Sequence, residues 1–348
     1  MRYPTFVLFI ICFYSTNAQV GGESIYGFLN VPSSARAQYL GKAGMSYDDQ
    51  DIALILSNPS HLSKTMHKKV MVSTNFLFGN SFNTLSYVTN VKNIGAMGFA
   101  LQGNTYGEIP MRDINGTQIG NMSPLDLTFS TLYARNAGPY KIGMNGKLIY
   151  SKLDNQTQSF ACGLDIAISK TDSANTRSIS FIIKNIGGQV ISYKNNAEAF
   201  PFDIQFGFSQ RLKHLPFRFG ILVHDLYRWN ITFDDPVLYK VNSLNNTTAA
   251  IGKFSVVDNL FRHINFSGEF YFGKSFRVGI GYDHQRRAEL AYETTIGLSG
   301  FSFGFNINTR KFDIGYSLAK YSTVGAANQF TLILKMNEFY KKHEPVIK

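Results

Sequence analysis

Histidine and carboxylate side chains, which general acid–base catalysis commonly uses, occur at three places in the chain. The candidates are His224-Asp225, Asp234-Asp235 and His284. A hydrolase would also need a serine or cysteine nucleophile beside the base. The sequence offers no nucleophile with a recognisable base partner, so we interpret these residues as polar groups of loops and strand ends. We therefore expect the protein not to be an enzyme.

A second group of charged residues, 283–289, contains two adjacent arginines. Arginine forks suit phosphate and carboxylate groups, so His284, Arg286 and Arg287 are candidates for binding a phosphate or a partner protein. The alternative is a solvated rim that also meets lipopolysaccharide. Glu269 and Arg277 differ from this group, because strand periodicity places both on the polar faces of adjacent strands. We expect them to form a structural ion pair inside a barrel lumen.

Motifs for cofactor chemistry are missing from the sequence. We find neither a nucleotide-binding glycine signature nor a zinc-ligand cluster nor a nucleophile elbow, so no cofactor and no metal are expected. The 30 glycines are spread through the strand-like segments. There they permit curvature or close packing inside a barrel.

The N-terminus has the features of a secretory signal peptide over residues 1–18. Arg2 is followed by an apolar stretch, 6–14, and by a small-residue cleavage site that ends at Ala18. Removal of this segment with Cys12 would leave Cys162 without an intramolecular disulfide partner. No other segment has eighteen consecutive apolar residues, so no transmembrane helix is expected. An exported protein can nevertheless span a membrane as a closed barrel, because closure satisfies every backbone polar group.

The composition favours a membrane barrel over a soluble domain. Charged residues make up 16% of the 348 residues, against about 25% in a typical soluble domain. The net charge is +11, but the lysines and arginines are scattered rather than striped along a helix. Together with export, this argues against nucleic acid as a partner and favours lipopolysaccharide phosphates or acidic partners.

Alternation of apolar and polar residues dominates the chain from Lys68 onward. It is clearest in 202–209, 263–272 and 312–319, and it predicts strands with one apolar and one polar face. Many segments reach about twelve residues, as membrane barrels require, whereas soluble strands usually have about five or six. We therefore predict an all-β fold, a transmembrane antiparallel barrel of about fourteen strands. The expected strands are 68–78, 81–91, 93–105, 124–136, 140–151, 157–170, 176–187, 200–213, 216–228, 260–273, 275–287, 295–308, 310–321 and 326–337.

The lengths of the predicted loops agree with this count. Short connections follow every even-numbered strand, and long ones follow only odd-numbered strands. Barrels place short turns in the periplasm and long loops outside, so the first strand should start on the periplasmic side. The longest loop, 229–259, is a candidate partner-docking surface or a lid over the lumen. Its candidate contact residues are Trp229, Phe233, Asp234, Tyr239 and Phe254.

The regions that flank the predicted barrel, 68–337, have other characters. Residues 19–67 contain two short stretches compatible with helix, of which 51–56 ends at the helix-breaking pair Asn58-Pro59. We expect this region to be a hatch that caps the barrel or plugs its lumen. Residues 338–348 are expected to form a polar periplasmic tail.

The hatch region carries the first of two family resemblances. Residues 33–41, Asp48-Asp49 and 58–62 resemble the N-terminal motif of FadL-like outer-membrane proteins. That resemblance implies a fourteen-stranded barrel with an N-terminal hatch. Residues 22–30 resemble the start of the PorQ family of the type IX secretion system, and further matches run through the mature chain. These further matches are 201–203, 213–218, 224–229, 300–304 and 320–321.

The PorQ resemblance implies a non-enzymatic docking platform in the outer membrane. It would anchor a cell-surface attachment complex of PorZ-like, PorU-like and PorV-like proteins that displays secreted cargo. The basic C-terminus departs from the aromatic end that barrels commonly carry. The FadL resemblance implies an alternative function, a channel for hydrophobic small molecules. That reading requires an apolar path, whereas the expected inward faces are mainly small, polar or charged. An outer-membrane enzyme is the third and weakest hypothesis.

Overall fold

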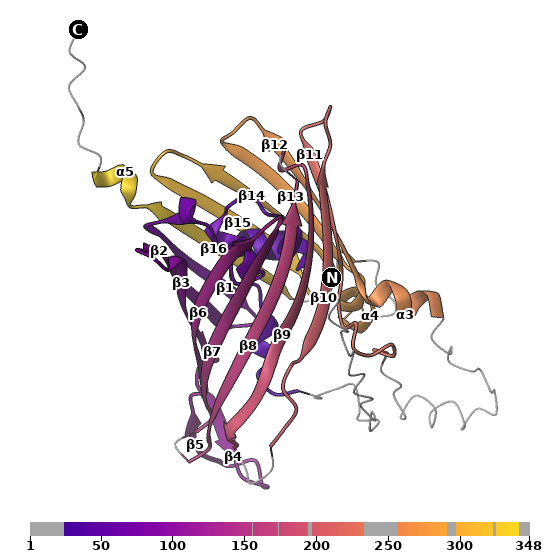
Figure 1. Ribbon diagram of the computed structural model, residues 1–348. Coiled ribbons are helices and arrows are strands. Elements are labelled where there is room, and N and C mark those ends of the chain that lie inside the picture. Colours follow the sequence, from indigo (N-terminus) through magenta and orange to yellow (C-terminus); the bar gives the residue numbers. More distant parts are fainter. Residues whose placement is uncertain are drawn as a thin grey trace, which may run out of the picture.

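The computed structural model describes residues 24–340, apart from 155, 173, 194–196, 233–255, 291–296 and 323–324. Within these residues, fourteen antiparallel strands close into a barrel, and β1 pairs with β16 to complete the ring (Figure 1). The strands of the barrel are β1 (Lys69–Leu77), β2 (Asn80–Val91), β3 (Gly95–Thr105), β6 (Leu125–Ala137), β7 (Tyr140–Lys152), β8 (Gln158–Thr171), β9 (Arg177–Ile191), β10 (Asp203–Arg211), β11 (Phe217–Val223), β12 (Ile264–Phe272), β13 (Phe276–Asp283), β14 (Phe301–Asn308), β15 (Phe312–Lys320) and β16 (Ala326–Lys335). The predicted fold class is confirmed.

The two faces of the strands are inverted relative to a soluble protein. In β15, Asp313 and Ser317 are buried in the lumen, whereas Phe312, Ile314 and Leu318 are exposed on the outside. Exposed apolar side chains in such numbers are unfavourable in water and favourable in a hydrocarbon environment. The outer wall is therefore suited to contact with lipid.

Four predicted strands extend too far at one end of the barrel: 216–228, 260–273, 275–287 and 295–308. Strand β11 ends at Val223, and soon afterwards Asp225 adopts a left-handed φ of 54° that interrupts extended backbone. The helices α3 (Val256–Arg262) and α4 (His284–Leu290) include residues 260–262 and 284–287, which we assigned to strands. The Asp283 carboxylate accepts a hydrogen bond from the Arg286 N–H and so caps α4.

The ends of the barrel differ in the length of their connections. Six short turns lie at the end where β1 begins and β16 finishes, and we call this the periplasmic end. The helix α5 (Asn337–Tyr340), part of the predicted polar tail, lies at the same end (Figure 1). At the opposite, extracellular end, the predicted loop 106–123 contains a separate hairpin of β4 (Ile109–Arg112) and β5 (Gln118–Met122). The predicted signal peptide and residues 341–348 lie outside the described residues.

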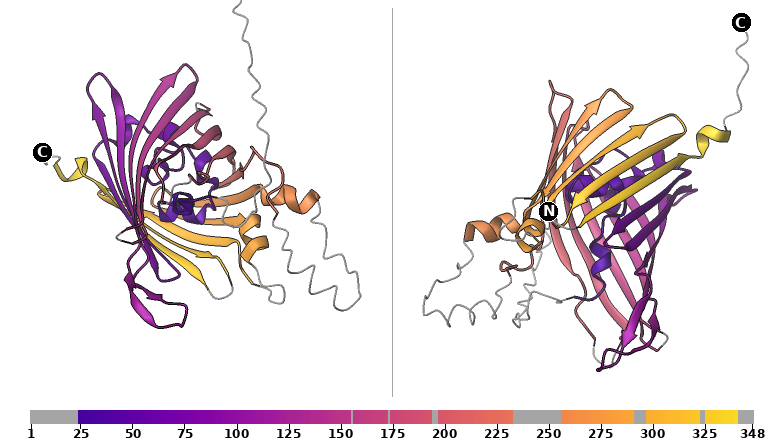
Figure 2. Two further views of the ribbon diagram at one scale, coloured as in Figure 1. Left: turned by 90° about the horizontal axis from the view of Figure 1, so that it is seen from below. Right: turned by 180° about the vertical axis from the view of Figure 1, so that it is seen from behind.

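The N-terminal segment folds inside the barrel, as Figure 2 shows for its indigo ribbon. We call residues 24–67 the hatch. It begins in the extracellular half of the lumen and reaches the periplasmic end, where β1 starts. Its short helices are η1 (Gly27–Asn30), α1 (Ala35–Tyr39), η2 (Ala43–Ser46), η3 (Ile52–Leu54), η4 (Pro59–His61) and η5 (Lys64–Met66). Of the two places considered for the hatch, the structure shows the lumen.

Side chains cap several of these short helices. Ser34 accepts a hydrogen bond from the Ala37 N–H at the start of α1, and Asp51 accepts one from the Ala53 N–H at the start of η3. The predicted breaker Asn58-Pro59 starts η4, with proline in the first turn. The remaining described helices are also short, and no helix of the described chain has the length and apolar character needed to cross a membrane.

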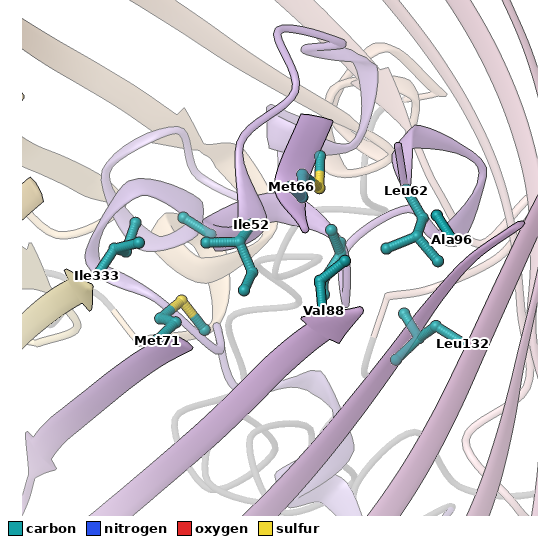
Figure 3. Close-up of a cluster of buried hydrophobic side chains, with 10 residues drawn as sticks. Ile52, Leu62, Met66, Met71, Val88, Ala96, Leu132 and Ile333 are labelled. Carbon is teal, nitrogen blue, oxygen red and sulfur yellow. The ribbon is translucent and has the colours of Figure 1, made fainter. Parts of the chain in front are cut away.

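Apolar packing fixes the periplasmic half of the hatch. Ile52 and Met66 of the hatch pack against Met71, Val88 and Ile333 of the barrel wall (Figure 3). All five side chains are almost fully buried. Burying a side chain of this size stabilises a fold by about 1.5–3 kcal/mol, so this cluster holds the hatch against the wall beside its entry into β1.

Glycines in the wall let the hatch approach closely. A Cβ atom at Gly143 of β7 would overlap the backbone of Pro59 and Ser60. A Cβ atom at Gly279 would overlap the ring of Tyr39. The expectation that strand glycines permit close packing in the lumen is therefore correct at these positions.

Candidate functional site

Arg36 is the centre of the polar contacts between hatch and barrel. Its side chain is 1% exposed and donates five hydrogen bonds, as many as a guanidinium has N–H groups. Two go to Glu269 of β12, at 3.1 Å from Nε and 2.7 Å from Nη2. Two go to Asp49, at 2.8 and 2.6 Å, and one goes to Asp51 at 2.8 Å. One buried arginine thus joins two parts of the hatch to the wall.

A second arginine completes this cluster from the barrel side. Arg277 of β13 lies 3.3 Å from an Asp49 carboxylate oxygen and 3.8 Å from one of Asp51. Burial alone would raise the pKa of Asp49, but Arg36 and Arg277 outweigh it and hold that pKa well below the usual range. Tyr39 of α1 donates a 2.6 Å hydrogen bond to Glu269. We call Arg36, Asp49, Asp51, Glu269 and Arg277 the hatch lock.

The expected direct ion pair between Glu269 and Arg277 is not the arrangement that the structure contains. Both side chains face the lumen, as predicted, but Glu269 binds Arg36 whereas Arg277 binds Asp49 and Asp51. In the strand register, Arg277 lies opposite Tyr271 and not opposite Glu269. The hatch separates the two predicted partners and supplies the countercharge for each.

Above the hatch, a cavity of about 830 Å³ occupies the extracellular half of the lumen. Its walls come from the hatch, from the extracellular ends of several strands, and from α4. Apolar and aromatic groups line one part of it, including Leu29, Val31, Phe200 and Tyr227. The floor belongs to the hatch, so the cavity and the hatch form one unit.

Charged groups line the rest of the cavity, and several are already paired. Lys147 lies 2.8 Å from Asp165 and donates a 2.7 Å hydrogen bond to Asn185. Lys42 of the hatch lies 3.9 Å from Asp283. The cavity is therefore amphipathic, which suits a small molecule that has both an apolar body and a polar or charged group.

His224 and Asp225 form the histidine–carboxylate pair that the sequence suggested. The His224 Nδ1 lies 2.8 Å from Asp225, and its Nε2 lies 2.9 Å from the Asn265 side-chain oxygen. Burial would raise the pKa of Asp225, but the hydrogen bond with His224 and its charge lower it. An asparagine thus occupies the position beside the His224 Nε2 that a nucleophile would need.

The other residues predicted from the rim lie at the extracellular end. His284 contacts Tyr282 at 3.0 Å and Asp258 of α3 at 2.9 Å. Arg286 lies 3.4 Å from Asp283 and 4.3 Å from the centre of the Tyr321 ring. Arg287 donates a 3.0 Å hydrogen bond to the Gly297 carbonyl. All three arise from α4, so the structure brings them together but gives them partners within the chain.

Of the five candidate contact residues of the proposed docking loop, Trp229 is the one whose structure is described. This residue is 57% exposed, and its ring stacks on that of His263 with ring centres 5.6 Å apart. Phe233, Asp234, Tyr239 and Phe254 lie outside the described residues. Whether the loop binds a partner or covers the lumen stays a prediction.

The sequence analysis missed the role of Arg36, Asp49 and Asp51. All three lie in or beside the N-terminal motif, and their charges within an otherwise small and apolar region were the available signal. A buried charge requires a partner, but the sequence does not show that these three meet one another and Glu269.

Comparison with known proteins gives information on the fold and not on the function. No protein-family model matches the chain, and no curated protein matches it, so the PorQ resemblance is not confirmed. Among solved structures, the toluene transporter TodX of Pseudomonas putida aligns with a TM-score of 0.51 at 9% identity, covering 86% of this chain and 96% of its own. The TodX deltaS2S3 mutant, a monoaromatic hydrocarbon channel, gives 0.50 at 11% identity and covers 86% and 97%. The chain therefore shares the barrel fold of TodX.

Proposed function

We propose that the protein is an outer-membrane channel of the FadL type that takes up a small amphipathic molecule. The observation that carries this proposal is the 830 Å³ cavity, which lies at the extracellular end directly above the hatch. The outward apolar belt supports placement in a membrane, and the similarity to TodX supports a channel with this fold.

The lining of the cavity indicates the class of substrate. A site for a hydrocarbon would be lined mainly by apolar groups, whereas this one combines Phe200 and Val31 with Lys42, Lys184 and Asp203. Moving a charged group out of water requires a partner in the site. We therefore expect the substrate to carry a polar or charged group on an apolar body.

The hatch lies below the cavity, so it would have to move before a substrate could pass along the lumen to the periplasmic end. The wall beside the cavity provides an alternative exit. Strand β10 pairs with β9 only from Arg177 to Lys184, so among the described residues no strand pairs with 185–191 on that side. Backbone and side-chain contacts of the 197–202 segment close this seam, among them a 2.7 Å hydrogen bond from Asn185 to the Pro201 carbonyl. We propose that substrate leaves the cavity through this seam.

Uptake into liposomes tests the proposal. Purified protein is reconstituted, and entry of toluene, phenylacetate and phenethylamine is measured against protein-free vesicles. The variant Ala199→Phe places a bulky group at the cavity, and Ala174→Phe makes the same change in a periplasmic turn. We expect charged probes to enter through the wild type and Ala174→Phe, and entry to be lost in Ala199→Phe. Wild-type vesicles that admit none of the probes above background would refute the proposal.

A second function, docking of a cell-surface attachment complex of the type IX system, is favoured by one feature of α3. Val256, Val257, Leu260 and Phe261 are 42–70% exposed. The polar residues of the helix turn inward instead, where Asn259 donates a 2.6 Å hydrogen bond to the Trp229 carbonyl. An exposed apolar patch of this kind is typical of protein contacts.

Affinity capture from solubilised outer membranes distinguishes the two functions. We expect type IX attachment proteins to be retained by the wild type and lost in Val257→Ser/Phe261→Ser. The control Val190→Ser changes an equally exposed residue on β9. Capture that is identical for all three proteins, or that lacks such partners throughout, would remove the docking proposal.

A further inference from the structure

Positive charge is distributed around the whole periplasmic end of the barrel. Each of the six short turns has a lysine or arginine within it or within three residues of it. One residue from each turn, in chain order, gives Lys92, Arg135, Lys170, Lys213, Lys274 and Arg310. All six are exposed. Together with Arg177 we call them the periplasmic basic ring.

Carboxylates do not balance this ring. By the same three-residue criterion, the described acids are Asp172 and Asp313. Asp172 accepts hydrogen bonds from the Thr176 and Arg177 N–H groups of its own turn, and Asp313 lies 2.7 Å from Lys335 in the lumen. Arg310 lies 3.0 Å from Glu338 of α5. Among the described residues of the extracellular end, several cations are instead paired with acids: Arg228 lies 3.9 Å from Asp225, Arg262 2.7 Å from Asp258 and Arg286 3.4 Å from Asp283. Among the described residues, the unbalanced positive charge therefore lies at the periplasmic end.

Strand geometry shows where part of the ring points. Successive side chains of a strand face opposite sides of the sheet. Ser169 and Ser178 are buried in the lumen, so their neighbours Lys170 and Arg177 face outward. The Lys170 Nζ lies 5.6 Å from the centre of the Tyr140 ring. Long cationic side chains next to tyrosine at the edge of an apolar belt are typical of the boundary between hydrocarbon and lipid headgroups.

We propose that the periplasmic basic ring binds the phosphate groups of anionic phospholipids, such as phosphatidylglycerol, in the inner leaflet. This inference rests on the membrane placement made under the proposed function, and it goes beyond that function. A protein partner would contact one sector of the rim, whereas lipid headgroups surround the barrel, as the cations do. The outward direction of Lys170 and Arg177 also favours lipid over a partner below the membrane.

Lipid selectivity in reconstituted vesicles tests this proposal. The full chain is inserted into phosphatidylcholine vesicles, and electron spin resonance measures how strongly spin-labelled phosphatidylglycerol and phosphatidylcholine associate with it. The ring variant is Lys170→Gln/Arg177→Gln. The matched control, Arg112→Gln/Lys152→Gln, removes two cations from the extracellular end. Each cation near an anionic headgroup raises local association by about fivefold at low salt.

We expect the wild type and the control to prefer phosphatidylglycerol, and the ring variant to lose much of that preference. Salt at about 1 M, where the screening length is roughly 3 Å, should abolish it. Equal association of both lipids with the wild type, or an equal loss in the control, would overturn the proposal. If the wild type shows no lipid preference but binds poly-glutamate resin, and the ring variant does not bind it, the ring binds an acidic protein instead. Failure of the folded barrel to insert at all would count against the membrane placement and not against the ring.

Discussion

Replacing Arg36 by methionine is expected to release the hatch from the barrel lumen. The arginine uses all five N–H groups on three carboxylates, and no other cation of the described hatch lock contacts Glu269 within ion-pair distance. The methionine variant keeps the apolar volume but leaves Glu269, which is 0% exposed, without its ion-pair partner.

The size of the effect follows from this burial. Removing one member of a buried ion pair costs about 3–5 kcal/mol, because the other charge stays desolvated and uncompensated. Asp49 and Asp51 retain some exposure and keep Arg277 nearby, so we expect the lower part of that range. A loss of about 3 kcal/mol raises the population of undocked hatch by roughly two orders of magnitude.

Hydrogen exchange of residues 35–66 in the detergent-solubilised barrel measures this population. Protection of the hatch should fall in Arg36→Met, while protection of the barrel strands stays unchanged. Hatch protection in Arg36→Lys should lie between that of the wild type and that of Arg36→Met, because lysine keeps the positive charge but has only three donors on a compact ammonium group. The control Arg112→Met removes an exposed arginine from the extracellular hairpin. Unchanged hatch protection in Arg36→Met would refute the view that the lock holds the hatch.

Three further outcomes are expected for the hatch. Gly143→Ala should expose it to protease, because the added methyl overlaps the hatch backbone, whereas Gly146→Ala on the same strand meets open space and should change nothing. Asn58→Ala should lower hatch protection by about 1–3 kcal/mol, since it leaves the Met45 carbonyl and the Ser60 N–H without the partners that Asn58 gives them. Burial lowers the pKa of His61 to about 4, below its usual value of about 6.5, so the released hatch binds the proton more tightly. Hatch protection should therefore fall as pH drops from about 6.5 to 4, and His61→Gln should flatten that dependence.

The sequence by itself determined the barrel and the difference between its two ends. Alternation with period two, sustained over long segments such as 140–151 and 310–321, admits few other folds, because a shift by one residue would turn every side chain to the wrong face. The lengths of the predicted loops then distinguished the end with short turns from the end with long connections. Strand ends beyond Val223 were misjudged, since apolar alternation continues into residues where capping and a left-handed residue end the strand.

The tertiary structure alone decided the candidate site. Arg36 and Glu269 are far apart in the chain, and strand periodicity could place Glu269 in the lumen but could not say what it meets there. Pairing of buried charges depends on distance in three dimensions, which local pattern does not contain. Gly143 and Gly279 are a second example. The sequence suggested that strand glycines leave room in the lumen, but only the folded chain shows that the hatch occupies this room.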